Sequence, residues 1–129
     1  MKNKRIIIID EDNLTAAGLA ARLNAWGADS RTIDTTTDMD AILKELWLSP
    51  PDYILVGLND NPDSHNHILY SIKSDTELYS IPTFSYTQSA QEITPHPSID
   101  KHISHNNIIS NRFLSKLEKI IRHWEISAA

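Results

Sequence analysis

The chain has 129 residues, 40% of them hydrophobic and 22% charged, a composition typical of one soluble globular domain. Its net charge of −5 and its lack of a Lys/Arg cluster argue against a nucleic-acid-binding surface. Cysteine is absent, which excludes disulfides and thiolate metal sites, and no apolar run approaches the ~20 residues of a membrane span. We therefore expect a cytoplasmic protein with a single domain over residues 1–129.

The first half of the chain alternates apolar strands with amphipathic helices. A strand over residues 4–9 holds four consecutive isoleucines, and the helix after it begins at a cap, Asp12 or Asn13, and stops at Gly27. A weak strand over residues 30–33 is polar enough for the edge of a sheet. The next helix, which two prolines terminate, is predicted to bury Ile42, Leu43, Leu46 and Trp47.

Residues 53–56, Tyr-Ile-Leu-Val, form the strand around which the chain is organised. The segment has no polar alternation, which is typical of a central strand in a parallel sheet covered by helices on both faces. Gly57 follows at its carboxyl end, and a polar turn occupies residues 59–62. Open α/β sheets hold their chemistry at that end of the strands, yet glycine has no side chain to contribute.

The second half of the chain repeats the same alternation. A third helix carries Ile68, Leu69 and Ile72 on its buried face and ends near Asp75; a longer helix would add Tyr79 to this face. A fourth strand spans residues 81–87, residues 88–98 form a proline-broken turn or loop, and a short fifth strand spans residues 100–104. Ser110 or Asn111 caps the last helix. Its apolar stripe, predicted to pack on the sheet, consists of Phe113, Leu114, Leu117, Ile120, Ile121 and Trp124. Five strand–helix units predict a doubly wound α/β domain.

In their order and spacing, residues 6–13, 51–56 and 72–84 resemble the receiver domain of bacterial response regulators, and the resemblance covers nearly the whole chain. It implies a (βα)5 flavodoxin-like three-layer sandwich with a parallel sheet in the order 2-1-3-4-5, here with the fourth helix short or missing. It also implies a role in a two-component signalling pathway or phosphorelay. No Gly-rich phosphate loop or nucleophile elbow appears, so we do not expect an enzyme.

Some positions match the functional residues of the receiver family. Asp10 and Glu11 match the acidic pair that holds Mg²⁺ in the family, although glutamate is one methylene longer than the usual second acid. Thr87 matches the hydroxyl residue at the end of the fourth strand, which serves as a switch. Weak binding of Mg²⁺ at Asp10 and Glu11 stays open.

Other positions depart from the family. The phosphoacceptor aspartate corresponds to Gly57, the lysine of the fifth strand to His105, and the aromatic switch residue to His102. Mg²⁺ demands near-ideal octahedral oxygen geometry, and losing one carboxylate also removes the reason to keep a lysine cation in the pocket. We interpret the chain as a pseudo-receiver, which needs no cofactor and acts by protein binding without phosphorylation.

In receivers, the fourth helix, fifth strand and fifth helix form the face that docks partners. This face is also the most altered region of the chain, through the polar, proline-broken residues 88–98 and through residues 102–106. We expect a protein partner at this face and neither nucleic acid nor a membrane. A homodimer stays open, as does an output domain after Ala129.

Two other functions stay open as well. One is a phosphoacceptor receiver that uses Asp60, three residues after Gly57, in place of the missing aspartate. The other is a module that senses a small ligand or a metal.

The histidines do not favour the metal alternative. Zinc needs several ligands that converge tetrahedrally, and the histidine spacings match no known pattern. We expect surface or loop histidines and no metal site; the positions considered are His65, His67, His96, His102 and His105. If His105 lies beside Asp10, its titration near neutral pH is a further hypothesis.

Overall fold

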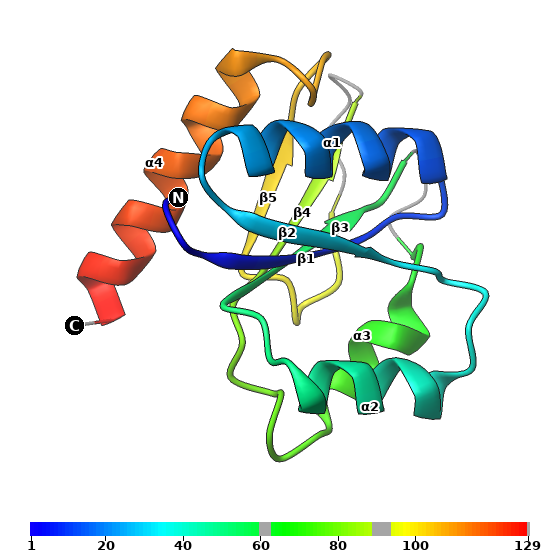
Figure 1. Ribbon diagram of the computed structural model, residues 1–129. Helices are drawn as coiled ribbons and strands as arrows, with labels where there is room; N and C mark the ends of the chain where they lie inside the picture. The colour runs from blue at the N-terminus through cyan, green and yellow to red at the C-terminus, as the bar shows by residue number, and fades with distance from the viewer. Residues whose placement is uncertain (60–62, 89–93, 129) are drawn as a thin grey trace.

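The computed structural model describes residues 1–59, 63–88 and 94–128. Five parallel strands form one sheet in the order β2-β1-β3-β4-β5, as predicted (Figure 1). The strands are β1 (Arg5–Ile9), β2 (Asp29–Ile33), β3 (Tyr53–Gly57), β4 (Thr83–Thr87) and β5 (Lys101–Ser104). The helices described are α1 (Asn13–Ala25), α2 (Met39–Leu48), α3 (Asn66–Lys73) and α4 (Asn111–Ala128).

The helices form the outer layers of a three-layer sandwich. Helices α1 and α4 cover one face of the sheet, and α2 and α3 cover the other (Figure 1). Side chains alternate along a strand, so Ile6 and Ile8 pack under α1 and α4 while Ile7 and Ile9 pack under α2 and α3. This alternation explains why four consecutive isoleucines suit a strand that is buried on both faces.

Between β4 and β5, residues 94–98 are described and form no helix, while residues 89–93 of the predicted loop lie outside the described residues. With α4 in the place of the last helix, the described elements fit the expectation that the fourth helix of the receiver fold is short or missing. The polar strand β2 lies at one edge of the sheet, as predicted, and β5 lies at the other.

Local signals account for how the helices begin and end. The Asp12 carboxylate accepts hydrogen bonds from the backbone N–H groups of Leu14 and Thr15, which makes it the N-cap of α1. Gly27, just beyond α1, has a φ of +97°, a left-handed conformation that glycine adopts at little cost. Ser110 Oγ accepts a hydrogen bond from the N–H of Phe113 at the start of α4.

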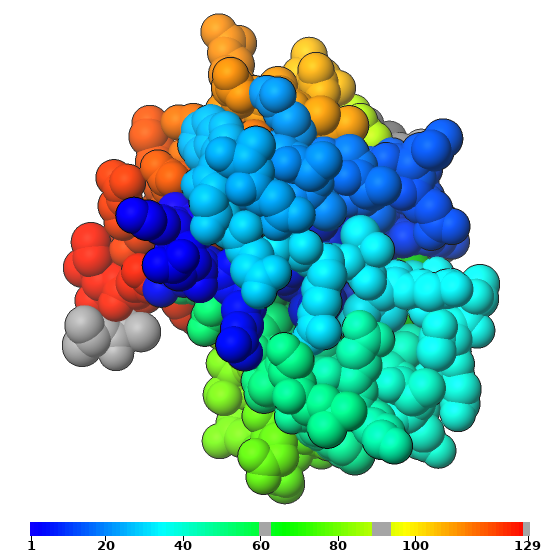
Figure 2. All heavy atoms as spheres, in the orientation of Figure 1, coloured from blue at the N-terminus to red at the C-terminus, as the bar shows by residue number. Residues whose placement is uncertain are grey.

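The predicted stripe of α4 packs on the sheet. Phe113, Leu114, Leu117 and Ile121 are buried, and Ile120 and Trp124 are partly buried. The N-terminal ammonium of Met1 pairs with Glu118 of α4 at 3.1 Å, and Figure 2 shows the first residues lying against this helix. Among the described helices, none combines the length and the apolar character that crossing a membrane requires.

Two aromatic residues predicted on buried helix faces are exposed. Trp47 is 48% exposed in the last turn of α2, and its Nε1 donates a hydrogen bond to Asp75, so the ring lies at the rim between α2 and α3. Tyr79 is 60% exposed, because α3 ends at Lys73 and Tyr79 belongs to the loop beyond it. Helical spacing alone predicted the wrong environment for both residues.

Candidate functional site

The candidate site lies at the carboxyl edge of the sheet, where the ends of the parallel strands meet. Gly57 is the last residue of β3, Asp10 directly follows β1, and Thr87 is the last residue of β4. The register of β3 and β4 sets Gly57 beside Tyr86. The fold therefore brings together several of the predicted site positions, with Tyr86 as an additional member.

Asp10 is almost fully buried, with 1% of its surface exposed, and both of its carboxylate oxygens accept hydrogen bonds. The Tyr86 hydroxyl donates to Oδ2 at 2.7 Å, and the backbone N–H of Asp12 donates to Oδ1 at 2.9 Å. Burial raises the pKa of Tyr86, and the charge and hydrogen bond of Asp10 raise it further. Tyr86 consequently remains a protonated donor to Asp10 at physiological pH.

Gly57 is required by space rather than by backbone conformation, because its φ is not positive. A Cβ atom built on Gly57 would lie within contact distance of Asp10 Oδ2, 2.6 Å from Asp10 Cγ and 2.9 Å from Tyr86 Oη. Real Cβ atoms essentially never approach other heavy atoms this closely. Asp10 and Tyr86 thus occupy the space into which a side chain at position 57 would project.

The other two acids of this edge have separate roles. Glu11 is exposed, and its Oε1 accepts a hydrogen bond from Asn59 Nδ2 at 3.2 Å. The Asp12 carboxylate caps α1, and the hydrogen bonds from Thr15 lower its pKa. Gly57 has no side-chain oxygen, so this edge lacks one of the carboxylates that an oxygen shell for Mg²⁺ would use, and weak binding at Asp10 and Glu11 stays a prediction. Within the described ranges, no three His, Asp or Glu side chains converge to hold a metal.

The two predicted switch positions, Thr87 and His102, lie together on the face of the sheet that α2 and α3 cover in part. His102 Nδ1 lies 2.6 Å from Ser85 Oγ, and its Nε2 lies 3.4 Å from both Thr87 Oγ1 and Ser104 Oγ. Burial lowers the pKa of His102. Its half-buried imidazole is therefore held by hydroxyl groups of β4 and β5.

His105 reaches this edge through its backbone, because its N–H donates a hydrogen bond to the Thr87 carbonyl at 3.0 Å. The His105 ring packs against Phe113 with centroids 6.1 Å apart, and its Nδ1 accepts the N–H of Asn107 at 3.0 Å. No described hydrogen bond or ion pair joins His105 to Asp10, so the idea of their coupled titration stays a prediction. Asp60 lies outside the described residues.

His65 lies in the loop before α3 but is buried, with only 8% of its surface exposed. It precedes α3 in a left-handed conformation with a φ of +63°, and its Nε2 has no hydrogen-bond partner among the described residues. Burial lowers the pKa of His65, while the charges of Glu11 and Asp10 act in the opposite direction. No feature of its polar sequence neighbourhood predicted this burial.

Tyr86 is the residue that sequence reasoning missed. The signal was a large hydroxyl-bearing side chain directly before Thr87, on the strand expected beside Gly57. Recognising it required the register of β3 and β4, which places the largest side chain of β4's carboxyl end beside a residue with no side chain.

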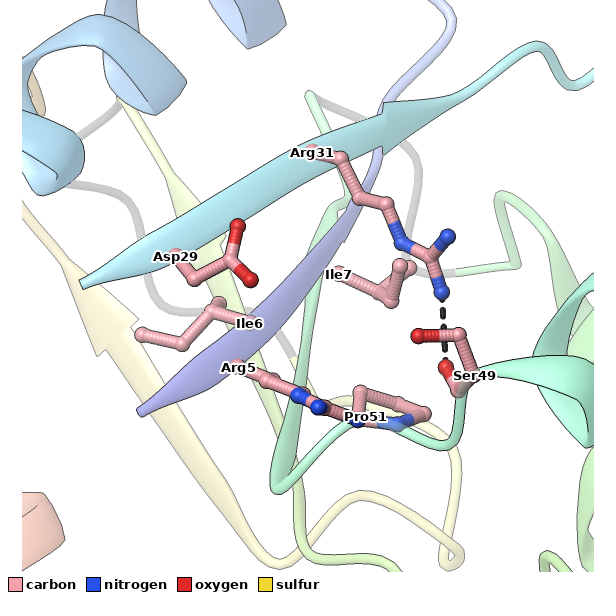
Figure 3. A pocket seen from close by; sticks show the side chains of 7 residues that line it. All are labelled: Arg5, Ile6, Ile7, Asp29, Arg31, Ser49 and Pro51. Atoms are coloured by element: carbon pink, nitrogen blue, oxygen red, sulfur yellow. Dashed lines mark hydrogen bonds between the residues drawn. The ribbon is translucent and has the colours of Figure 1, made fainter. Parts of the chain in front are cut away.

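A separate cavity of about 200 Å³ lies at the opposite, amino-terminal edge of the sheet (Figure 3). It is lined by the first residues of β1 and β2 and by the segment before β3. Arg31 points into it and donates a hydrogen bond to the Ser49 carbonyl at 2.7 Å (Figure 3). The Arg31 guanidinium also lies 3.8 Å from the Glu45 carboxylate. The guanidinium of Arg31 is thus engaged within the chain.

Solved structures similar to this chain include response regulators. The first domain of a response regulator/sensory box/GGDEF protein from Carboxydothermus hydrogenoformans is 18% identical, with a TM-score of 0.67 over 98% of this chain and 100% of that one. The phosphorylated cyanobacterial phytochrome response regulator RcpA is 20% identical, with a TM-score of 0.67 over 98% and 96%. TrrA from Thermotoga maritima, in complex with Mg²⁺ and BeF, is 16% identical, with a TM-score of 0.65 over 92% and 97%.

The chain has the receiver fold. At these identities the similarity concerns the fold alone, and it confirms the predicted flavodoxin-like arrangement. No family model matches the sequence, and no curated protein matches it significantly.

Proposed function

We propose that this chain is a receiver-like signalling module of a two-component pathway that binds other proteins without being phosphorylated. The observation that carries the proposal is the packing around Gly57. The position that resembles the phosphoacceptor has no carboxylate, and Asp10 and Tyr86 fill the space that an acceptor side chain would need. The chain keeps the receiver fold but has no room for a phosphoacceptor side chain. Its surfaces can still bind other proteins, and we infer that it signals through them.

The same packing accounts for the other altered positions. With the oxygens of Asp10 engaged by Tyr86 and Asp12, the site offers no ready shell for Mg²⁺ and no phosphoryl group for a lysine to neutralise. His105, at the lysine position, packs on Phe113 instead. We place the partner surface on β5 and α4, the described elements of the face that docks partners in receivers.

Amide NMR spectra recorded with and without Mg²⁺ and beryllofluoride test this proposal. TrrA, which has been crystallised with Mg²⁺ and BeF, serves as the positive control. We expect the amide signals of Asp10, Gly57 and Thr87 to stay in place at concentrations that saturate the control. Saturable shifts of these signals would overturn the proposal, because they would show that the site still accepts a phosphoryl analogue.

A further inference from the structure

A groove with a volume of about 530 Å³ lies between β5 and α4. Lys101 of β5 lines one side, and residues of α4 spaced three or four apart line the rest. Residues with this spacing share one face of a helix. The α4 residues that matter here are Lys116, Lys119, Ile120, His123 and Trp124.

Positively charged side chains outnumber negatively charged ones around the groove. Lys101, Lys116 and Lys119 are exposed, and none of them forms an ion pair in the part of the chain that the structure describes. The one acid of the lining, Asp100, uses its Oδ2 to accept the backbone N–H of Thr83 at 2.8 Å. A chain with a net charge of −5 therefore presents a local cationic surface.

The acids of α4 are held away from this surface. Glu118 binds the Met1 ammonium at 3.1 Å, and Glu125 binds Lys4 at 2.7 Å and accepts a hydrogen bond from the Tyr53 hydroxyl at 2.9 Å. Helix α4 thus uses its negative side chains to attach to the start of the chain. Its lysines are left for an external anion.

The floor of the groove is apolar. Ile120 and Trp124 are partly buried, and the Trp124 ring meets the Phe84 ring edge-on with centroids 5.8 Å apart. A ligand that fills the groove must place apolar groups on this floor and negative groups beside the lysines. Acidic residues interspersed with large apolar ones in a protein segment meet both requirements.

We propose that this groove binds an acidic, leucine-rich amphipathic segment of a partner protein. The proposal rests on the proposed function, since it names the chemistry of the partner that the module would bind. A nucleic acid or an anionic membrane suits the groove less well, because either would extend beyond three lysines onto a chain that is acidic elsewhere.

The probe for this proposal is a synthetic helical peptide with glutamates along one face and leucines along the other. Two matched peptides carry glutamine in place of glutamate, or serine in place of leucine. Titration calorimetry with the full chain should show binding of the first peptide that weakens with added salt, and weaker binding of both matched peptides. Lys119→Glu should reduce affinity about tenfold, because it reverses a charge that faces the peptide.

Lys44→Glu makes the same charge change at an exposed position of α2, away from the groove, and should leave the affinity for the peptide unchanged. The proposal is overturned by no binding, by equal loss in both variants, or by tighter binding of duplex DNA or phosphatidylserine vesicles. Self-association through the groove, seen by sedimentation, would also overturn it. These outcomes would overturn the proposal for the groove without showing that the chain is phosphorylated. Shifts of the amide signals with beryllofluoride would instead overturn the proposed function.

Discussion

The carboxyl edge of the sheet and the β5–α4 groove treat their charged groups in opposite ways. At the edge, the carboxylate of Asp10 is buried and both of its oxygens accept hydrogen bonds from within the chain. In the groove, Lys116 and Lys119 are exposed and have no described ionic partner. Polar groups that already hydrogen-bond one another inside a protein are less available to a ligand than exposed, unpaired charges, so the groove is the better candidate for binding a partner.

The largest expected effect comes from restoring an acid at the carboxyl edge. Gly57→Asp would drive a side chain into the space of Asp10 and Tyr86 and set two carboxylates against each other. We expect the free energy of unfolding, measured by urea denaturation, to fall by about 3 kcal/mol.

Gly18→Ala is the matched control for Gly57→Asp. The added Cβ would meet chiefly the end of the flexible Ile109 side chain at 2.9 Å, and alanine favours the helix by up to about 1 kcal/mol. We expect this variant to keep its stability or gain a little. If Gly57→Asp were as stable as the wild type, the carboxyl edge would have room for a side chain at position 57, which would contradict the account.

Tyr86→Phe tests the hydrogen bond that closes the edge. Losing the hydroxyl leaves Asp10 Oδ2 buried without that donor, so the free energy of unfolding should fall by about 2 kcal/mol. Tyr53→Phe removes a hydroxyl that binds the more exposed Glu125, and it should cost less than about 1 kcal/mol. Equal losses in thermal or chemical denaturation would contradict the special role of Tyr86.

A smaller effect is expected from pH. Burial lowers the pKa of His65 below its ordinary value of 6.5, so the unfolded chain binds more protons than the folded chain in the window below that value. The contribution of His65 to stability is therefore present above pH 6.5 and declines as the pH falls through this window.

His65→Asn, which tolerates the left-handed backbone, should make the loss of stability between about pH 7 and pH 5 shallower. His67→Asn changes an exposed neighbour and should leave the slope as it is. Denaturation midpoints measured across this range decide the matter; parallel slopes in wild type and His65→Asn would contradict the burial of His65.

The elements of the fold could be predicted from local patterns. The isoleucines of β1 and the apolar Tyr53–Val56 segment indicate buried strands, because helices cover both faces of each strand and exclude water. Asp12 and Gly27 set the ends of α1 through capping and a left-handed turn. The order of the strands rested on the resemblance to receivers, since local patterns do not specify which strands pair.

The filling of the site could not be predicted in the same way. The sequence indicates that Gly57 lacks an acceptor, but the packing of Asp10 and Tyr86 into its place depends on the register between β3 and β4. Trp47 and His65 show the same limit. The helical period predicts which side chains share a face of a helix. It does not predict which of them the neighbouring elements bury.

Treatment with acetyl phosphate and Mg²⁺, followed by intact mass measurement, tests the central claim most directly. RcpA, known in its phosphorylated form, is the positive control. We predict that the control gains a phosphoryl group and that this chain keeps its unmodified mass. A phosphoryl adduct on this chain would contradict the account, and its loss in Asp60→Asn would identify Asp60 as the acceptor.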